Sequence, residues 1–259
     1  MPATPPTYSY PSDCYNKKGK LKKKCDESSK YMVDKGKPAI PGTPAMATCV
    51  VDRDDAYKFT DQQPGTAPSA NRGWIPTWNE ATNSSSTTCS PAATIVPLSN
   101  DKTALKDAID GLQSNGATAG ALGTAWAWHM LSPNWASIWP KTATPRPYSE
   151  LSEKNEKGEP KLRKIAILLT DGEYNQFGGY STKTSQVSAD AQQICDKMKR
   201  TGIIIYAIGF EIGKSGSAYD TLKACASSQS NFFNSNSGEE LRQAFREIAL
   251  QISTLRLSM

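Results

Sequence analysis

The stretch 164-KIAILLTDGE-173 decides the fold, because an apolar run of strand length ends in a carboxylate on a turn. Residues 165–170 are aliphatic or β-branched, as in a strand buried within a sheet. Asp171 and Gly172 follow directly, so an acid is expected at the carboxyl end of a buried strand. Open α/β sheets bind their ligands at this end of the strands.

Further strands and helices alternate around this stretch. Residues 203–210 are apolar on both faces, as a central parallel strand is, and a shorter strand is expected at 231–234. Helices are predicted at 101–114, after 118 to 131, at 185–200, at 218–226 and from a capping box at 237–240 onward. This alternation with short connections predicts an α/β fold with a doubly wound, mainly parallel sheet.

The helical patterns also predict caps and inward faces. Ser99 or Asn100 is expected to cap the first helix. The residues expected to face inward are Val187, Ala191, Ile194 and Met198 in the third helix, and Leu241, Phe245, Ile248, Ala249 and Ile252 in the last.

The front of the chain differs in composition from the back. Twelve of the seventeen prolines lie in residues 1–97, together with clusters of Gly, Ser and Thr. One short β-like stretch is expected there, at 47–51. We therefore predict two parts: residues 1–97, an irregular cysteine-containing insertion, and residues 98–259, the carboxyl-terminal part of an α/β domain.

The net charge of +5 is local, because six lysines fall between Lys17 and Lys24. Without that run the rest of the chain is nearly neutral. A lysine run without interleaved aromatic residues or a recognition helix is usually a solvated loop, so no nucleic-acid partner is expected.

Six cysteines and a single histidine argue against zinc or thioredoxin-like chemistry. Three disulfides in an oxidising compartment explain the even cysteine count better than zinc or thioredoxin-like chemistry does. The expected pairs are Cys14–Cys25, Cys49–Cys89 and Cys195–Cys225. Sequence permits about fifteen connectivities, and six reduced thiols in a cytoplasmic protein are the alternative.

Four segments together resemble a von Willebrand factor A domain, and more narrowly that of TadG-type Tad/Flp pilus-assembly proteins. They are 116-GATAGALGTAWAWHMLSPNWASIWP-140, 164-KIAILLTDGEYN-175, 202-GIIIYAIGF-210 and 231-NFFNSNSGEELRQAFREIALQISTLRLS-258. The front, with 49-CVVDRDDAYKFTD-61, resembles the cysteine-containing insertion of the same proteins more loosely.

The resemblance implies a magnesium site built from three loops. Thr118 would supply the hydroxyl of the second loop and Asp171 the carboxylate of the third. The Asp-x-Ser-x-Ser triplet of the first loop is absent, and residues 26–30 are its nearest approach. Because two ligands cannot enclose a cation that takes about six oxygens, Mg²⁺ binding should be weak or absent in this chain. The residue-level alternatives are a helix cap for Thr118 and a turn cap for Asp171.

The resemblance also implies an incomplete sheet. In the family's strand order 3-2-1-4-5-6 the chain supplies strands 4, 5 and 6, so we expect it to be the carboxyl-terminal part of a longer protein. One edge of an apolar strand is then left uncovered.

The predicted function is a non-enzymatic extracytoplasmic adhesion or scaffolding domain linked to Tad/Flp pilus assembly. Its partner would be a protein ligand, either a pilus-assembly component or a cell surface, with membrane association only through a segment absent from this chain. A metal-independent structural module is the first alternative. An enzyme is the second, either a hydrolase or an NAD-dependent enzyme.

The enzyme alternative has little support in the sequence. The glycine pattern at 116–123 follows a helix instead of a strand, which argues against dinucleotide binding. His129 has no Ser or Cys motif beside it and is expected to be a packing histidine. The neighbouring tryptophans, Trp126, Trp128, Trp135 and Trp139, are expected to be core residues, with an exposed binding patch as the alternative.

Overall fold

The computed structural model describes the backbone of residues 7–9, 31–34, 48–50, 52–53, 55–63, 77–79, 95–112, 118–177, 180–181 and 184–257. The chain divides into two compact units, one of residues 1–50 with 77–94 and one of residues 51–76 with 95–259. The sequence prediction placed residues 51–76 in the first part, which ended at residue 97. The structure assigns these residues to the larger unit.

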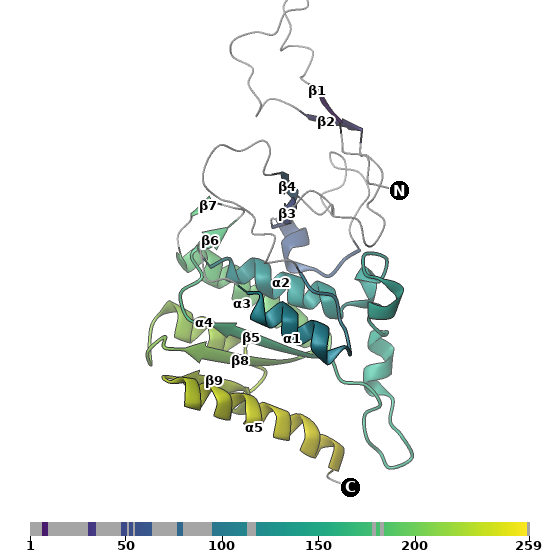
Figure 1. The fold of residues 1–259 in the computed structure, drawn as a ribbon, viewed down its shortest axis with the longest axis vertical. Helices are drawn as coiled ribbons and strands as arrows, with labels where there is room; N and C mark the ends of the chain where they lie inside the picture. The colour runs from purple at the N-terminus through teal and green to yellow at the C-terminus, as the bar shows by residue number, and fades with distance from the viewer. Residues whose placement is uncertain are drawn as a thin grey trace, which may run out of the picture. The chain divides into compact units, whose positions relative to one another are not determined.

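The smaller unit contains two antiparallel strand pairs among its described residues (Figure 1). β1 (Thr7–Ser9) pairs with β2 (Tyr31–Asp34), and β3 (Thr48–Val50) pairs with β4 (Thr77–Asn79). The β-like stretch predicted at 47–51 is therefore a strand, whereas the other three strands were not predicted. The lysine run and the side chains of Cys14, Cys25, Cys49 and Cys89 lie outside the described residues.

The larger unit is built on a three-stranded sheet with the order β5-β8-β9. β5 (Ile165–Thr170), β8 (Ile204–Phe210) and β9 (Phe232–Ser235) are parallel to one another. The predicted α/β class and parallel sheet are thereby confirmed, and β8 is the central strand. A short antiparallel pair, β6 (Gln176–Phe177) and β7 (Tyr180–Ser181), follows β5.

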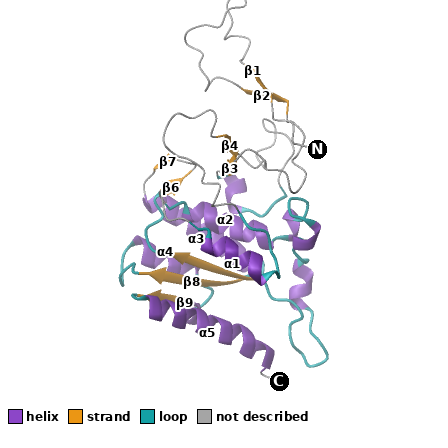
Figure 2. Ribbon diagram, in the orientation of Figure 1, coloured by secondary structure: helices purple, strands orange, loops and turns teal. Residues whose placement is uncertain are grey.

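Helices cover both faces of this sheet (Figure 2). α2 (Gly120–Leu131), α3 (Thr184–Arg200) and α4 (Ser217–Cys225) share one apolar core with the β5 and β8 side chains that point toward them. α5 (Gly238–Leu257) packs on the other face, where Tyr206 and Ile208 meet Ile248.

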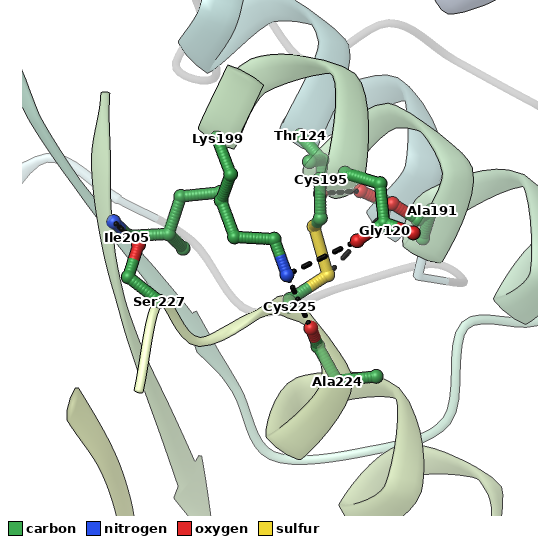
Figure 3. Close-up of a disulfide and its surroundings, with 10 residues drawn as sticks. Gly120, Thr124, Ala191, Cys195, Lys199, Ile205, Ala224, Cys225 and Ser227 are labelled. Atoms are coloured by element: carbon green, nitrogen blue, oxygen red, sulfur yellow. Dashed lines mark hydrogen bonds and ion pairs between the residues drawn. A yellow bond between two sulfur atoms is a disulfide. The ribbon is translucent and has the colours of Figure 1, made fainter. Parts of the chain in front are cut away.

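The α3 and α4 side of the sheet follows the sequence prediction closely. Val187, Ala191, Ile194 and Met198 are fully buried, as their helical spacing predicted. Gly202 has a φ of +87°, which ends α3 with a conformation that other residues rarely adopt. The predicted disulfide between α3 and α4 is present, with both sulfurs fully buried (Figure 3).

Two helices differ from their predictions. α1 (Lys102–Asp110) is capped by Asp101, whose carboxylate accepts from the backbone N–H groups of Thr103 and Ala104, so the prediction of a Ser99 or Asn100 cap is wrong. In α5, Phe245 is 41% exposed and Ala249 is exposed, against prediction. Ala244 is buried instead, because the inward stripe of α5 runs through residues 241, 244 and 248.

The remaining described elements are short 3₁₀ helices. They are η3 (Asp55–Phe59), η5 (Pro133–Trp135), η6 (Lys141–Ala143), η7 (Tyr148–Ser152) and η8 (Gln229–Asn231). The polar stretch 140–163 thus contains η6 and η7. No helix among the described residues is both long enough and apolar enough to cross a bilayer.

Candidate functional site

Two loops meet at the carboxyl end of β5. The backbone N–H of Thr118 donates to Oδ1 of Asn175 at 2.9 Å, and the N–H of Asn175 donates to the carbonyl of Thr118 at 3.0 Å. This reciprocal pair joins the loop before α2 to the loop after β5. The structure therefore brings together the two loops that carry Thr118 and Asp171.

A close helix-to-loop contact fixes the same junction. A Cβ on Gly120 would lie 2.1 Å from the ring of Tyr174, so only glycine fits this position without a shift. Tyr174 is buried, and burial raises its pKa to about 12. The first turn of α2 can therefore lie directly on the loop of residues 171–175.

Asp171 is exposed on this junction, and its carboxylate has no hydrogen-bond partner among the described residues. The turn is closed by Thr170, whose hydroxyl accepts from the N–H of Gly172 at 3.3 Å. A turn-capping role for Asp171 is thus not what the structure shows. The neighbouring Glu173 is exposed as well.

Thr118 does not cap α2. The N-cap residue is Ala119, and no side chain caps this helix start. The described contacts of Thr118 are made by its backbone, so its hydroxyl takes no part in them. The helix-cap interpretation of Thr118 is therefore wrong.

The oxygen donors at this junction suit a hard cation by type, but they are few. A hydroxyl and a carboxylate are the chemistry that Mg²⁺ prefers. No group of three or more His, Cys, Asp or Glu side chains within the described part of the chain could hold a metal. Residues 26–30 lie outside that part, so the described donors do not by themselves fit a closed magnesium site.

A second cluster, formed by residues 52–53 and 55–63, packs against the body of the larger unit and was not predicted. The Asp61 carboxylate accepts from the hydroxyls of Ser132 at 2.6 Å and Tyr148 at 2.7 Å, and the Asp61 carbonyl accepts from the Trp135 indole at 3.1 Å. Lys58 forms an ion pair with the buried Asp190 of α3 at 2.8 Å. The sequence shows that Asp61, Asp190 and Lys58 are charged residues, but no motif or spacing in it indicates their partners.

His129 lies within this second cluster. Its ring stacks on Trp135 with a centroid distance of 3.7 Å, and Nε2 lies 3.4 Å from the carbonyl of Thr60. Burial, with a further contribution from Arg53, lowers its pKa to about 3, so the ring is neutral at ordinary pH. The packing role predicted for His129 is confirmed.

The tryptophans near His129 are core residues. Trp126, Trp128 and Trp135 are buried, and Trp126 meets Trp135 and Trp139 edge to face. A patch of exposed tryptophans at this position is therefore ruled out. Neither Ser nor Cys is among the described neighbours that hydrogen-bond to the histidine ring, which leaves it without the arrangement of a nucleophilic triad.

A parallel sheet with helices on both faces and joined loops at its carboxyl end defines an open α/β domain, a fold that binds its ligands at this end of the strands where it has them. Residues 141–247 match the family model of the von Willebrand factor type A domain, and this segment contains all three sheet strands with α3 and α4. This segment is thus similar to the von Willebrand factor type A domain, a family whose members are generally non-enzymatic protein-interaction modules. No curated protein and no solved structure matches the chain. Asp171 lies inside the matched segment and Thr118 before it.

Proposed function

We propose that this chain is a non-enzymatic, extracytoplasmic binding domain that holds a protein ligand at the carboxyl end of β5. The observation that carries the proposal is the exposed Asp171 carboxylate, presented on a loop that Asn175 and Thr118 tie to the start of α2. A carboxylate without protein partners on a fixed loop is available to a ligand. The match to an interaction-domain family supports the same assignment.

The partner that we propose is a Tad/Flp pilus-assembly component or a cell surface. This part of the proposal rests on the resemblance of residues 116–140, 164–175, 202–210 and 231–258 to TadG-type proteins. The Cys195–Cys225 disulfide supports an oxidising compartment, since such bonds are rare in the cytosol. The structure describes no membrane-spanning helix, and any membrane association is proposed to involve another segment.

Magnesium would take part only weakly. Thr118 and Asp171 would hold it, and the bound cation would supply a positive charge that a ligand carboxylate can complete. The shortage of oxygen donors among the described residues is the reason to expect low affinity.

Binding of purified Tad/Flp pilus-assembly proteins to the immobilised full chain tests the proposal, in magnesium and in EDTA. Asp171→Ala and Thr118→Ala should each weaken retention about tenfold or more, since a hydrogen bond that involves a charged group contributes about 1.5 to 3 kcal/mol. Glu173→Ala is the matched control, an exposed carboxylate two residues away, and should bind normally. Equal binding by all variants would contradict a ligand site at Asp171.

A metal-independent structural module is the second candidate. The packing of residues 55–63 through Asp61 and Lys58 favours it, because hydrogen bonds and an ion pair join this segment from the front of the chain to the rest of the larger unit. Equal retention in magnesium and in EDTA would support this candidate over the metal-assisted one.

A further inference from the structure

Two aspartates of the chain are followed directly by glycine, in the pairs Asp110-Gly111 and Asp171-Gly172. Such a pair can rearrange chemically, because glycine has no side chain to shield its backbone nitrogen from the carboxyl carbon of the preceding aspartate. The reaction requires that the nitrogen and the carboxyl group are free to approach each other. The structure places the two pairs in opposite surroundings.

At Asp171-Gly172 both reacting groups are accessible. Asp171 is exposed, and its carboxylate accepts no hydrogen bond from the described residues. The N–H of Gly172 donates to the hydroxyl of Thr170 at 3.3 Å, beyond the usual range for such a bond. A Cβ built on Gly172 would meet no atom within 4 Å. The glycine therefore has open space beside it and a weakly held nitrogen.

At Asp110-Gly111 the same groups are held in place. Asp110 is the last residue of α1, and its carboxylate forms an ion pair with Lys106. The N–H of Gly111 donates to the carbonyl of Asp107 at 3.0 Å. A Cβ on Gly111 would lie 3.3 Å from that same carbonyl oxygen. Attack by this nitrogen therefore requires that a helix-end hydrogen bond opens first.

We propose that Asp171 is a modification site, at which aspartate converts slowly to isoaspartate. The nitrogen of Gly172 bonds to Cγ of Asp171, and a carboxyl oxygen leaves as water with the amide proton. Water then opens this five-membered ring at the main-chain carbonyl carbon of Asp171, which breaks the bond from that carbon to the Gly172 nitrogen. The main chain now runs through Cγ, and the former main-chain carbonyl is the new carboxylate. No atom is gained or lost overall, and water is the only reagent.

The rearrangement changes the surface at the carboxyl end of β5. It adds one methylene group to the main chain after Thr170 and moves the carboxylate onto Cα of residue 171. The carboxylate then no longer stands where the folded loop presents it, so a ligand held there should be lost. This consequence rests on the proposed function, whereas the rearrangement itself rests only on the chemistry and surroundings of the two residues.

Ageing of the full chain at physiological temperature and pH tests the proposal. Trypsin releases Asp171 in the peptide 165–183 and Asp110 in the peptide 107–141. Isoaspartate is measured in each peptide by enzymatic methylation and by a change of chromatographic retention without a change of mass. It should form about tenfold faster at Asp171, since a barrier raised by one hydrogen bond slows a reaction by about that factor. Asn115 also precedes a glycine, but its conversion changes the mass and is counted separately.

Gly172→Ala is the matched variant, because it keeps Asp171 and its added Cβ fits the open space. The methyl group shields the nitrogen, so isoaspartate at Asp171 should fall severalfold. In urea the two pairs of the native chain should react at similar rates, which shows that both are detected. Equal rates at the two pairs in the folded chain, no isoaspartate at Asp171, or a level that Gly172→Ala does not lower would each overturn the proposal.

Partner binding separates this inference from the proposed function. The aged native chain should retain purified Tad/Flp pilus-assembly proteins less well than the fresh chain, in proportion to its isoaspartate content. Gly172→Ala should keep the retention of its own fresh sample. An aged chain that contains isoaspartate at Asp171 and binds normally would confirm the modification and contradict the ligand site at Asp171.

Discussion

The two faces of the sheet are covered very differently. On one face α2, α3 and α4 bury Leu168 and Ile205 in a continuous core that also contains the disulfide. On the other face α5 covers β8 and β9 through Ile248, while Ile167 and Leu169 of β5 remain largely exposed. Figure 1 shows α5 alone on its side of the strands.

The two faces of the sheet therefore contribute differently to stability and to association. Buried apolar area contributes roughly 25 cal/mol per Å², so the three-helix face supplies most of the free energy of folding of the larger unit. The β5 end of the other face contributes little to folding and is left available for contacts. Each of the following predictions tests this division.

The largest effect is expected for Ile205→Ala on β8. Ile205 is fully buried against the three helices, and truncation of such a side chain costs about 2 to 5 kcal/mol. Ile167→Ala removes the same atoms from the neighbouring strand and should cost about 1 kcal/mol, because that side chain is already 40% exposed. Urea unfolding of both variants measures the difference. Equal losses would mean that the two faces are equally important for folding.

Removal of the disulfide should come next in size. The bond joins α3 to α4 across a sequence separation of 30 residues, and a loop of that length corresponds to about 3 to 4 kcal/mol. Cys195→Ala combined with Cys225→Ala should lower the free energy of unfolding by this amount in urea. An unchanged midpoint would show that the core between α3 and α4 does not need the bond.

Acid should weaken the packing of residues 55–63 against α2 through His129. Burial lowers the pKa of this histidine to about 3, below the value of about 6.5 in the unfolded chain. Between these values the unfolded chain binds the extra proton, so the stabilisation is complete above pH about 6.5 and is lost as the pH falls, by about 1.4 kcal/mol per pH unit. Urea unfolding between pH about 6.5 and 5 measures the slope.

His129→Phe is the comparison for that experiment. It keeps an aromatic ring against Trp135 and removes the only histidine in the chain. The variant should lose most of the slope in this pH range. An unchanged slope would assign it to a group other than His129.

The smallest effect is expected for Asp101→Ala at the start of α1. The change removes two capping hydrogen bonds, and a lost cap costs the helix about 1 kcal/mol. None of the residues of α1 is buried, so the global unfolding transition should move by less than about 0.5 kcal/mol. Faster hydrogen exchange confined to α1 would confirm this. A large global loss would show that α1 belongs to the folding core.

The elements of the sheet could be predicted from sequence because their patterns are local. A continuous apolar run specifies β8, and the spacing of Val187, Ala191, Ile194 and Met198 specifies the inner face of α3. Prediction failed for Phe245 because an apolar residue at helical spacing is buried only if something lies opposite. In α5 the buried positions are Ala244 and Ile248, and Phe245 lies beside that stripe.

The contacts between distant segments could not be predicted. Asp61 lies 71 residues from Ser132 and 87 from Tyr148, and no periodicity links a lone aspartate to such partners. Asp171 was predicted from its place at the end of a buried strand, whereas the ligand role of Thr118 rests on the resemblance. The structure adds that Asn175 joins their loops, which gives the pair a common position but does not test cation binding.

Because the disulfide is buried, the rate of its reduction should depend on how often the larger unit opens. Neither Cys195 nor Cys225 has exposed surface, so a reducing thiolate cannot reach either sulfur until α3 and α4 separate. Reduction of the native protein should therefore reach a rate that no longer increases with the concentration of reductant. That limiting rate is the rate at which the two helices open, and it sets how long the domain survives after it meets a reducing compartment.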